Sequence, residues 1–349
     1  MASQFLAPAL PKARQLPLAV TMGEPAGVGT EVTLRAWQAQ SQRSIPAFFL
    51  VDDPDRVRYV ARRLAWDIPV REVPSGLDAR GVFAEALPVV AMPQMPAIDL
   101  GRPNPEGAEA VLSSIRQAVR MTMEGEASGV VTNPIHKGVL YEAGFQFPGH
   151  TELLASLTDA GTAPVMMLAC PELRVVPVTV HNSLREAIDQ LTMASIIHCA
   201  RVTAAALRRD FGISQPRLSV AALNPHAGEG GALGREEIEI IQPAVDELRI
   251  DGVAVDGPHP ADTLFHRRSR GTYDAAICMY HDQALIPLKT IDFHRGVNIT
   301  LGLPIIRTSP DHGTALDIAG KGIANPASMI QALTIAHRMA RRRAAMPVP

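Results

Sequence analysis

Short apolar runs alternate with longer amphipathic stretches along most of this chain. The short runs are rich in Val, Ile and Ala and predict buried strands, whereas the longer stretches predict helices that cover them. Strands are expected at 18–21, 47–51 and 129–132, and helices at 31–39, 55–64, 104–123, 182–191, 194–210, 234–249 and 325–343. Residues 68–100 are rich in proline and are expected to be irregular apart from a short strand near Val89. The alternation predicts an α/β fold with a mostly parallel sheet.

Length and charge narrow the class of protein. The chain has 349 residues, enough for two α/β domains that share a cleft. A net charge of −2 gives no reason to expect binding to nucleic acid or to an anionic membrane, and no apolar stretch is long enough to cross a bilayer. Residues 1–17 lack the apolar centre of a secretory signal and are expected to form a disordered arm. The basic run 337–343 is expected to be a solvated helix end.

The cysteines indicate a reducing compartment. Cys170, Cys199 and Cys278 are far apart and form no Cys-x-x-Cys pair. Neither a disulfide framework nor a thiolate zinc site is therefore expected. A cytoplasmic protein fits this pattern.

Three of the apolar runs end on a histidine, and these residues are His181, His226 and His281. Sheets of this class bind ligands just beyond the carboxyl ends of their strands, and three imidazoles at one such place suggest a divalent metal ion. The alternative is that each is an ordinary surface or core histidine. Asp282 follows the last of them and could orient a metal ligand or cap a helix.

Two further loops are candidates for anion binding. Residues 23–30 contain three glycines and could cradle a phosphate, or could simply form a turn from strand to helix. Thr151 could cap the helix that follows Gly149, or could bind an anion there together with His150. The glycine-rich residues 224–234 would let the backbone approach a ligand closely.

Three cations in the segment 281–326 lie among apolar, strand-like residues. Lys289, Arg295 and Arg307 need negative partners if they are buried. An anionic substrate could supply the charge, or internal ion pairs with Asp292 or Asp311 could do so. Asn298 lies within a predicted strand, where a polar side chain needs a hydrogen-bond partner.

Several motifs resemble known enzymes. Residues 311–326 are similar to the nucleotide-binding loop of the isocitrate and isopropylmalate dehydrogenases, which bind NAD(P) without a Rossmann fingerprint. Six other segments resemble the 4-hydroxythreonine-4-phosphate dehydrogenase family, and they are residues 22–29, 149–152, 223–231, 260–265, 279–283 and 296–304. The resemblance implies two α/β domains around a central cleft and not a Rossmann fold. It places 18–135 with 300–349 on the nucleotide side, and 136–299 on the metal, substrate and dimer side.

The resemblance also implies roles for individual residues. The metal ligands would be His181, His226 and His281, holding Zn, Mg or Co. The substrate would be bound by His150, Thr151, Lys289, Asn298 and Arg307, with Asp262 contributed by the partner of a homodimer. The nucleotide would be bound by Gly313, Thr314, Asp317, Gly320 and Asn325.

The family's reaction is the NAD(P)-dependent oxidation of 4-phosphooxy-L-threonine in pyridoxal phosphate biosynthesis. The oxidised product then loses CO2 to give 3-amino-2-oxopropyl phosphate. Lys289, Asp282 and a metal-bound water are the candidates for general base. Two alternatives are a paralogue that acts on threonate or erythronate 4-phosphate or on a cis-dihydrodiol carboxylate, and a metal- or nucleotide-binding regulator that is not an enzyme.

Overall fold

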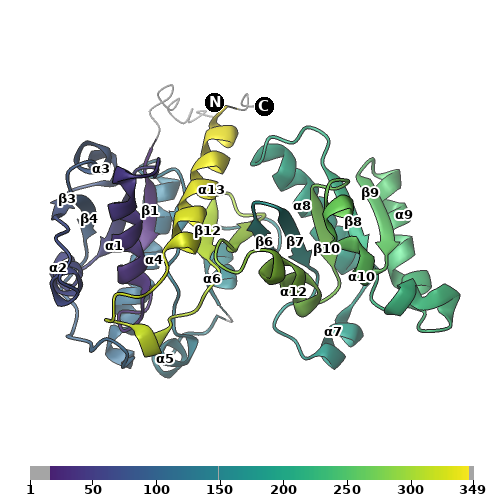
Figure 1. Cartoon of the computed structure of the whole chain (residues 1–349), viewed down its shortest axis with the longest axis horizontal. Coiled ribbons are helices and arrows are strands. Elements are labelled where there is room, and N and C mark those ends of the chain that lie inside the picture. The colour runs from purple at the N-terminus through teal and green to yellow at the C-terminus, as the bar shows by residue number, and fades with distance from the viewer. Residues whose placement is uncertain (1–15, 148, 346–349) are drawn as a thin grey trace, which may run out of the picture.

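A mixed 12-stranded sheet runs through the computed structural model, which describes residues 16–147 and 149–345 (Figure 1). The strand order is β3-β4-β2-β1-β5-β12-β11-β6-β7-β10-β8-β9. The strands are β1 (Leu18–Thr21), β2 (Phe48–Asp52), β3 (Val70–Val73), β4 (Leu87–Ala91), β5 (Val130–Val131), β6 (Val165–Cys170), β7 (Leu173–Pro177), β8 (Arg217–Ala221), β9 (Ala254–His259), β10 (Ala275–Cys278), β11 (Val297–Leu301) and β12 (Arg307–Pro310). The α/β class expected from the sequence is confirmed.

The sheet is parallel at its two ends and antiparallel at its centre. From β3 to β12 all neighbours run parallel, as do β7, β10, β8 and β9. In between, β11 is antiparallel to both β12 and β6, and β6 is antiparallel to β7. Eight of the eleven strand pairs that the described residues form are parallel, so the expectation of a mostly parallel sheet is confirmed, and the reversal at the centre is the exception. Its cause is local, because β6 and β7 are joined by two residues, which can link only antiparallel strands.

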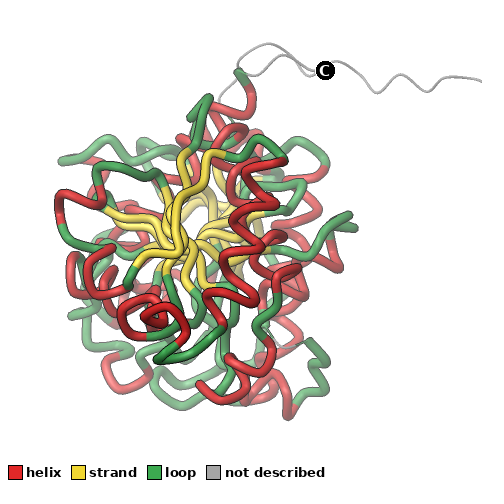
Figure 2. The backbone as a smooth tube through the Cα atoms, turned by 90° about the vertical axis from the view of Figure 1, so that its right-hand side faces the viewer, coloured by secondary structure: helices red, strands yellow, loops and turns green. Residues whose placement is uncertain are grey.

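Helices surround the sheet on both faces (Figure 2). They are α1 (Gly29–Gln38), α2 (Pro54–Arg63), α3 (Gly76–Val82), α4 (Ala108–Met123), α5 (Lys137–Glu142), α6 (His150–Leu157), α7 (Leu184–Gln190), α8 (Met193–Arg209), α9 (Gln242–Ile250), α10 (Ala261–Leu264), α11 (Arg267–Arg270), α12 (His281–Ile291) and α13 (Ala327–Ala344). Short helical turns include η2 (Pro105–Gly107), η3 (Pro225–Gly231), the π-helical η4 (Glu237–Ile241) and η5 (Leu316–Ile318).

Two local expectations need correction. The segment expected to be irregular contains β3 and α3, which are too short to give a clear apolar period. The helix expected at 234–249 is divided into η4 and α9. Pro243 lies in the first turn of α9 and has no N–H to continue the helical ladder, which explains the division.

The ends of the chain are only partly described. Most of the predicted disordered arm, residues 1–15, lies outside the described residues. Pro17 is held against the fold, since its carbonyl accepts the N–H of Ser128 at 2.8 Å. The basic run does end α13, but Arg343 pairs with the buried Asp210 at 2.8 Å and is therefore not simply solvated.

The buried apolar residues form one core that both halves of the sheet share and smaller cores within each half. One apolar cluster extends across both halves and two smaller clusters belong to one half each. The predicted domain boundary between residues 299 and 300 falls inside β11. The domain limits implied by the resemblance stay a prediction. No helix in the described part of the chain is long and apolar enough to cross a membrane.

Candidate functional site

The three strand-end histidines follow neighbouring strands. Strands β7, β10 and β8 are adjacent and parallel, so their carboxyl ends lie at the same edge of the sheet. The ring centroids of His181 and His281 are 6.0 Å apart. Among the described residues, however, no three His, Cys, Asp or Glu side chains are already grouped to hold an ion. His226 therefore does not complete a formed three-residue set with the other two.

Side-chain hydrogen bonds tie these three strand ends together. The Thr179 hydroxyl donates to the Met279 carbonyl at 2.8 Å and joins the end of β7 to that of β10. The Gln283 amide donates to the Ala222 carbonyl at 2.7 Å and accepts the N–H of Met279 at 2.7 Å, which joins β10 to β8. The backbones that carry the histidines are thus fixed relative to one another.

Two of the histidines have strained backbones. His181 has a φ of 52° and His226 a φ of 53°, and the left-handed run continues from His226 through Gly230. A left-handed conformation costs roughly 1–2 kcal/mol for each residue with a side chain. The buried Glu237 supports the run, because its Oε1 accepts the N–H groups of Leu223 and Asn224 at 2.8 Å. Strain held in place in this way is characteristic of functional sites.

Asp282 orients the ring of His281. Its Oδ1 lies 2.7 Å from Nδ1 of His281, which leaves Nε2 of the ring for another partner. The residue at the cap of α12 is Tyr280, so the alternative role of Asp282 as helix cap is wrong. A carboxylate on the far nitrogen of a histidine is the usual support of a metal ligand.

His181 is suited to be a neutral ligand. Burial lowers its pKa, as do the nearby Lys137 and His281, and Glu152 opposes the shift. A neutral imidazole has a free nitrogen for coordination at pH 7.

Arg307 is a buried cation without a carboxylate partner. It is 4% exposed, and burial lowers its pKa to about 10. Its guanidinium donates to the hydroxyls of Thr132 at 2.6 Å and Thr300 at 2.9 Å, and to the amide oxygen of Asn298 at 3.4 Å. No carboxylate of the described residues forms an ion pair with it. Leaving a buried charge uncompensated is unfavourable, so this arrangement favours an anionic ligand.

His150 adds an unused nitrogen to the same place. Its Nε2 is enclosed and has no hydrogen-bond partner among the described residues, although part of the residue is exposed. Burial lowers its pKa well below the ordinary value, with Arg307 and Lys137 acting in the same direction. Thr151 lies inside α6, and the capping residue Gly149 makes no side-chain cap bond, so the capping role considered for Thr151 is wrong.

Lys137 was not predicted from the sequence, yet its charge acts on His150 beside Arg307 and on His181 of the histidine group. Its Cε and Nζ are 3.4 Å from where a Cβ on Gly149 would be, and its charge lowers the pKa of both His150 and His181. It is the first residue of α5, where the helix dipole disfavours a cation. The sequence did contain an indication of this role, because His136 and Lys137 closely follow the carboxyl end of strand β5.

The other two cations of this region already have partners. Lys289 Nζ lies 3.1 Å from Oδ2 of Asp311, and Arg295 pairs with Asp292 and Glu172. For these two residues the alternative of internal ion pairs is correct. The pair of Lys289 and Asp311 also fastens α12 to the start of the predicted nucleotide-binding loop.

The first glycine loop packs against that nucleotide-binding loop. The Val28 N–H donates to the Thr314 carbonyl at 3.0 Å, and a Cβ on Gly27 would lie 2.9 Å from the same oxygen. Gly23 has a φ of 72°, as a turn requires. Residues 23–30 thus form a turn that supports residues 311–326. Of the predicted nucleotide residues, Asp317 is exposed and the Asn325 side chain accepts the N–H of Ala327 at 3.0 Å.

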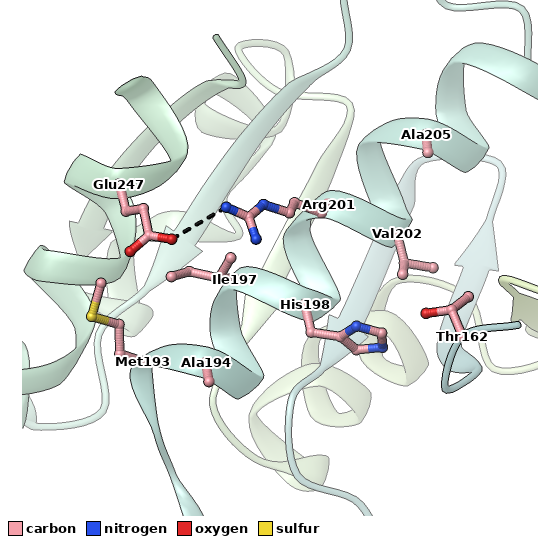
Figure 3. A pocket seen from close by; sticks show the side chains of 9 residues that line it. All are labelled: Thr162, Met193, Ala194, Ile197, His198, Arg201, Val202, Ala205 and Glu247. Atoms are coloured by element: carbon pink, nitrogen blue, oxygen red, sulfur yellow. Dashed lines mark hydrogen bonds and ion pairs between the residues drawn. The ribbon is translucent and has the colours of Figure 1, made fainter. Parts of the chain in front are cut away.

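Several hollows lie on the second half of the sheet. Asp262 and Asp282 line one of about 430 Å3, together with Phe265, Tyr280 and Ile286. Asp282 and Lys289 line another of about 430 Å3 on the surface of α12. A larger one of about 640 Å3 follows α8, where Arg201 lies 3.2 Å from Glu247 (Figure 3). None of the predicted site residues lines the larger hollow.

Known proteins resemble this chain over nearly its whole length. Residues 44–336 match the family described as pyridoxal phosphate biosynthetic protein PdxA. A 4-hydroxythreonine-4-phosphate dehydrogenase of Caulobacter vibrioides is 53% identical over 332 residues, which are 94% of this chain and 98% of that protein.

Solved structures agree with this match. The crystal structure of 4-hydroxythreonine-4-phosphate dehydrogenase from Klebsiella pneumoniae superposes with a TM-score of 0.83 and 38% identity, covering 93% of this chain and 99% of the other. A terephthalate 1,2-cis-dihydrodiol dehydrogenase from Burkholderia xenovorans gives a TM-score of 0.62 at 28% identity, covering 93% and 98%.

Proposed function

The chain belongs to the 4-hydroxythreonine-4-phosphate dehydrogenase family of pyridoxal phosphate biosynthesis and is an oxidoreductase, and we propose that it oxidises 4-phosphooxy-L-threonine with NAD(P)+. The family expected from the sequence motifs is confirmed. The alternative of a regulator without enzymatic activity is wrong. The cytoplasm is the proposed location, and the three cysteines are free and buried in the fold.

Arg307 is the observation that supports a phosphorylated substrate. A guanidinium that is buried and bonded only to neutral oxygens retains a full charge for an anion, and it can bind a phosphate or carboxylate through two N–H groups at once. We assign the substrate phosphate or carboxylate to Arg307 and Asn298. The free Nε2 of His150 and the ammonium of Lys137 are the further donors, with Thr151 and the backbone amides of the first turn of α6 beside them.

The histidines fit the divalent ion that the family implies. His181, whose pKa is lowered, and His281, oriented by Asp282, are suited as ligands, and we propose that ion binding brings His226 to this pair. When bound, the ion (Zn, Mg or Co) would polarise the substrate hydroxyl and then the ketone, and NAD(P)+ would accept the hydride. We assign the dinucleotide to Gly313, Thr314, Asp317, Gly320 and Asn325.

The hydroxyl proton needs an acceptor, and we propose Asp282, acting through one bridging water because it contacts the ring nitrogen of His281 that would face away from the ion. The Asp282 side chain is 70% exposed, so a water can reach it. Lys289 is the other candidate, but its ammonium is paired with Asp311 and would first have to lose a proton. Oxidation at C3 places a ketone β to the carboxylate. The C–C bond to the carboxylate then breaks, CO2 leaves, and the electron pair forms an enolate, which takes up a proton at C2 to give 3-amino-2-oxopropyl phosphate.

A homodimer is proposed from the surface of α12. Ile286, which lines the same hollow as Asp262, is 64% exposed, and Phe293, two residues beyond the end of α12, is 67% exposed. A second copy covering this face would place Asp262 at the partner's site. Ile286→Glu is expected to give a monomer in light scattering coupled to size-exclusion chromatography. A dimer that persists in Ile286→Glu and also in Phe293→Glu would place the interface elsewhere.

The reaction is tested by following NADH formation from 4-phosphooxy-L-threonine with and without a chelator. Turnover that the chelator abolishes is expected. Threonate 4-phosphate and a cis-dihydrodiol carboxylate are assayed in parallel, since the likeness to the terephthalate dihydrodiol dehydrogenase favours the latter as second candidate. A higher kcat/KM for either of them would replace the proposed substrate.

A further inference from the structure

A buried carboxylate on α1 holds the predicted nucleotide-binding loop. Glu31 is fully buried, and its Oε1 accepts the N–H of Gly320, a residue 289 positions away in the sequence. Its Oε2 accepts the N–H of Gly322 at 3.1 Å. One side chain therefore binds two backbone donors of the loop at once.

A second residue of α1, Arg35, holds the same segment of the loop. Gly320 and Gly322 have φ values of 77° and 68°, and the carbonyl of Gly322 accepts a hydrogen bond from Arg35 at 3.4 Å. Arg35 also stacks over the ring of Trp66 at 4.2 Å. Glu31 and Arg35, one turn apart on α1, thus bind the N–H groups and a carbonyl of the same loop segment.

Burying a carboxylate is unfavourable unless hydrogen bonds compensate for the lost water. Both oxygens of Glu31 are used on the loop, and no ion pair within 4 Å joins it to a described cation. The carboxylate is therefore explained by the loop geometry it maintains.

We infer that Glu31 is a positioning residue for the dinucleotide, acting through the backbone of Gly320 and Gly322. This rests on the proposed role of residues 313–325 in binding NAD(P). Without the two N–H bonds to Glu31, the glycines would be free to leave the conformation that receives the nucleotide. The effect is expected on dinucleotide affinity, whereas the substrate pocket around Arg307 should not change.

Glu31→Gln is the test, because it keeps the shape but exchanges one acceptor for an NH2 donor that faces a backbone N–H. Titration of the full-length protein with NADH and with NADPH, followed by nicotinamide fluorescence without metal or substrate, is expected to show about tenfold weaker binding. The matched control is Asp210→Asn, another buried carboxylate, which pairs with Arg343 at the far end of α13. That control should bind the dinucleotide as wild type does.

Steady-state kinetics separate positioning from general loss of structure. For Glu31→Gln, KM for NAD(P)+ is expected to rise while kcat at saturating dinucleotide and KM for the phosphorylated substrate stay within about twofold, since binding is weakened equally in the ground state and the transition state. Glu31→Asp keeps the charge but is too short to reach both glycines, and it should weaken binding as well. Unchanged affinity in Glu31→Gln and Glu31→Asp, or an equal loss in Asp210→Asn, would overturn the inference. Absence of NADH and NADPH binding in the wild type would instead overturn the proposed function.

Discussion

The Arg307 guanidinium donates to the hydroxyl of Thr132 at 2.6 Å, although the two residues are 175 positions apart. Thr132 follows β5 and Arg307 begins β12, and these strands are parallel neighbours. A hydroxyl satisfies the hydrogen-bonding capacity of the guanidinium without cancelling its charge. The pocket can therefore attract an anion, whereas a carboxylate in the place of Thr132 would have neutralised it.

Arg307→Met should separate stability from substrate binding. Removing a buried charge that lacks a partner is expected to raise the free energy of unfolding by roughly 1 kcal/mol or more. KM for the phosphorylated substrate should rise at least about a hundredfold, because a charged, bidentate contact is lost. Urea unfolding and steady-state kinetics measure the two effects. An unchanged kcat/KM in Arg307→Met and in Arg307→Ala would remove this residue from the anion site.

His226→Gly should remove a metal ligand and relieve backbone strain. Glycine adopts the left-handed conformation of residue 226 without a steric penalty, so stability should stay equal or rise by about 1 kcal/mol. Metal-dependent turnover should be abolished in His226→Gly and in His226→Ala. Calorimetric titration with Zn2+ or Co2+ measures the affinity directly. Full activity with one ion per chain would exclude His226 as a ligand.

Asp282→Asn should weaken metal binding without preventing folding. Loss of the carboxylate that orients His281 is expected to lower metal affinity by about 10- to 100-fold. The control is Asp246→Asn, an exposed acid on α9 that is 56% exposed. Equal affinities in the two variants would show that the contact to His281 does not support an ion. A fall in kcat at saturating metal would in addition support Asp282 as the base.

Lys137→Met tests the cation whose charge acts on both His150 and His181. KM for the phosphorylated substrate is expected to rise about tenfold, as for the loss of a charged hydrogen bond. The pKa values of His150 and His181 should both rise, because the positive charge that lowers them is gone. NMR titration of the imidazole protons follows this directly. Arg62→Met, in the last turn of α2, is the control and should leave both pKa values and KM unchanged.

The depressed pKa of His150 predicts a pH dependence of stability. The unfolded chain takes up a proton near the ordinary pKa of about 6.5, whereas the folded chain does so only at lower pH. Stability is therefore fully present above about pH 6.5 and is lost as pH falls through the interval down to the folded-state pKa. In His150→Gln this part of the loss should disappear. Urea unfolding between pH 8 and 5 checks it, and identical slopes for wild type and variant would contradict it.

Much of this protein was predictable from local sequence. The strand Leu18–Thr21 was located with its observed limits, and Asn104 begins the predicted helix 104–123 and caps the turn before α4, accepting the N–H of Glu106 at 3.0 Å. Apolar runs and capping residues interact with neighbours only a few positions away, so their effects can be predicted from the sequence alone. The same holds for the histidines that follow β7, β8 and β10.

The tertiary structure decided which charged groups have partners. Lys289, Arg295 and Arg307 look alike in sequence, but Asp311 and Glu172 neutralise the first two and only hydroxyls and an amide meet the third. The partners of Glu31 were likewise not predictable from local sequence, because they are the N–H groups of the distant residues 320 and 322. The order of strands determines these contacts, and a reversal of direction at the centre of the sheet brings distant segments together. Local patterns determined what is buried in this protein, and the packing of remote segments determined which buried charges remain free to bind a ligand.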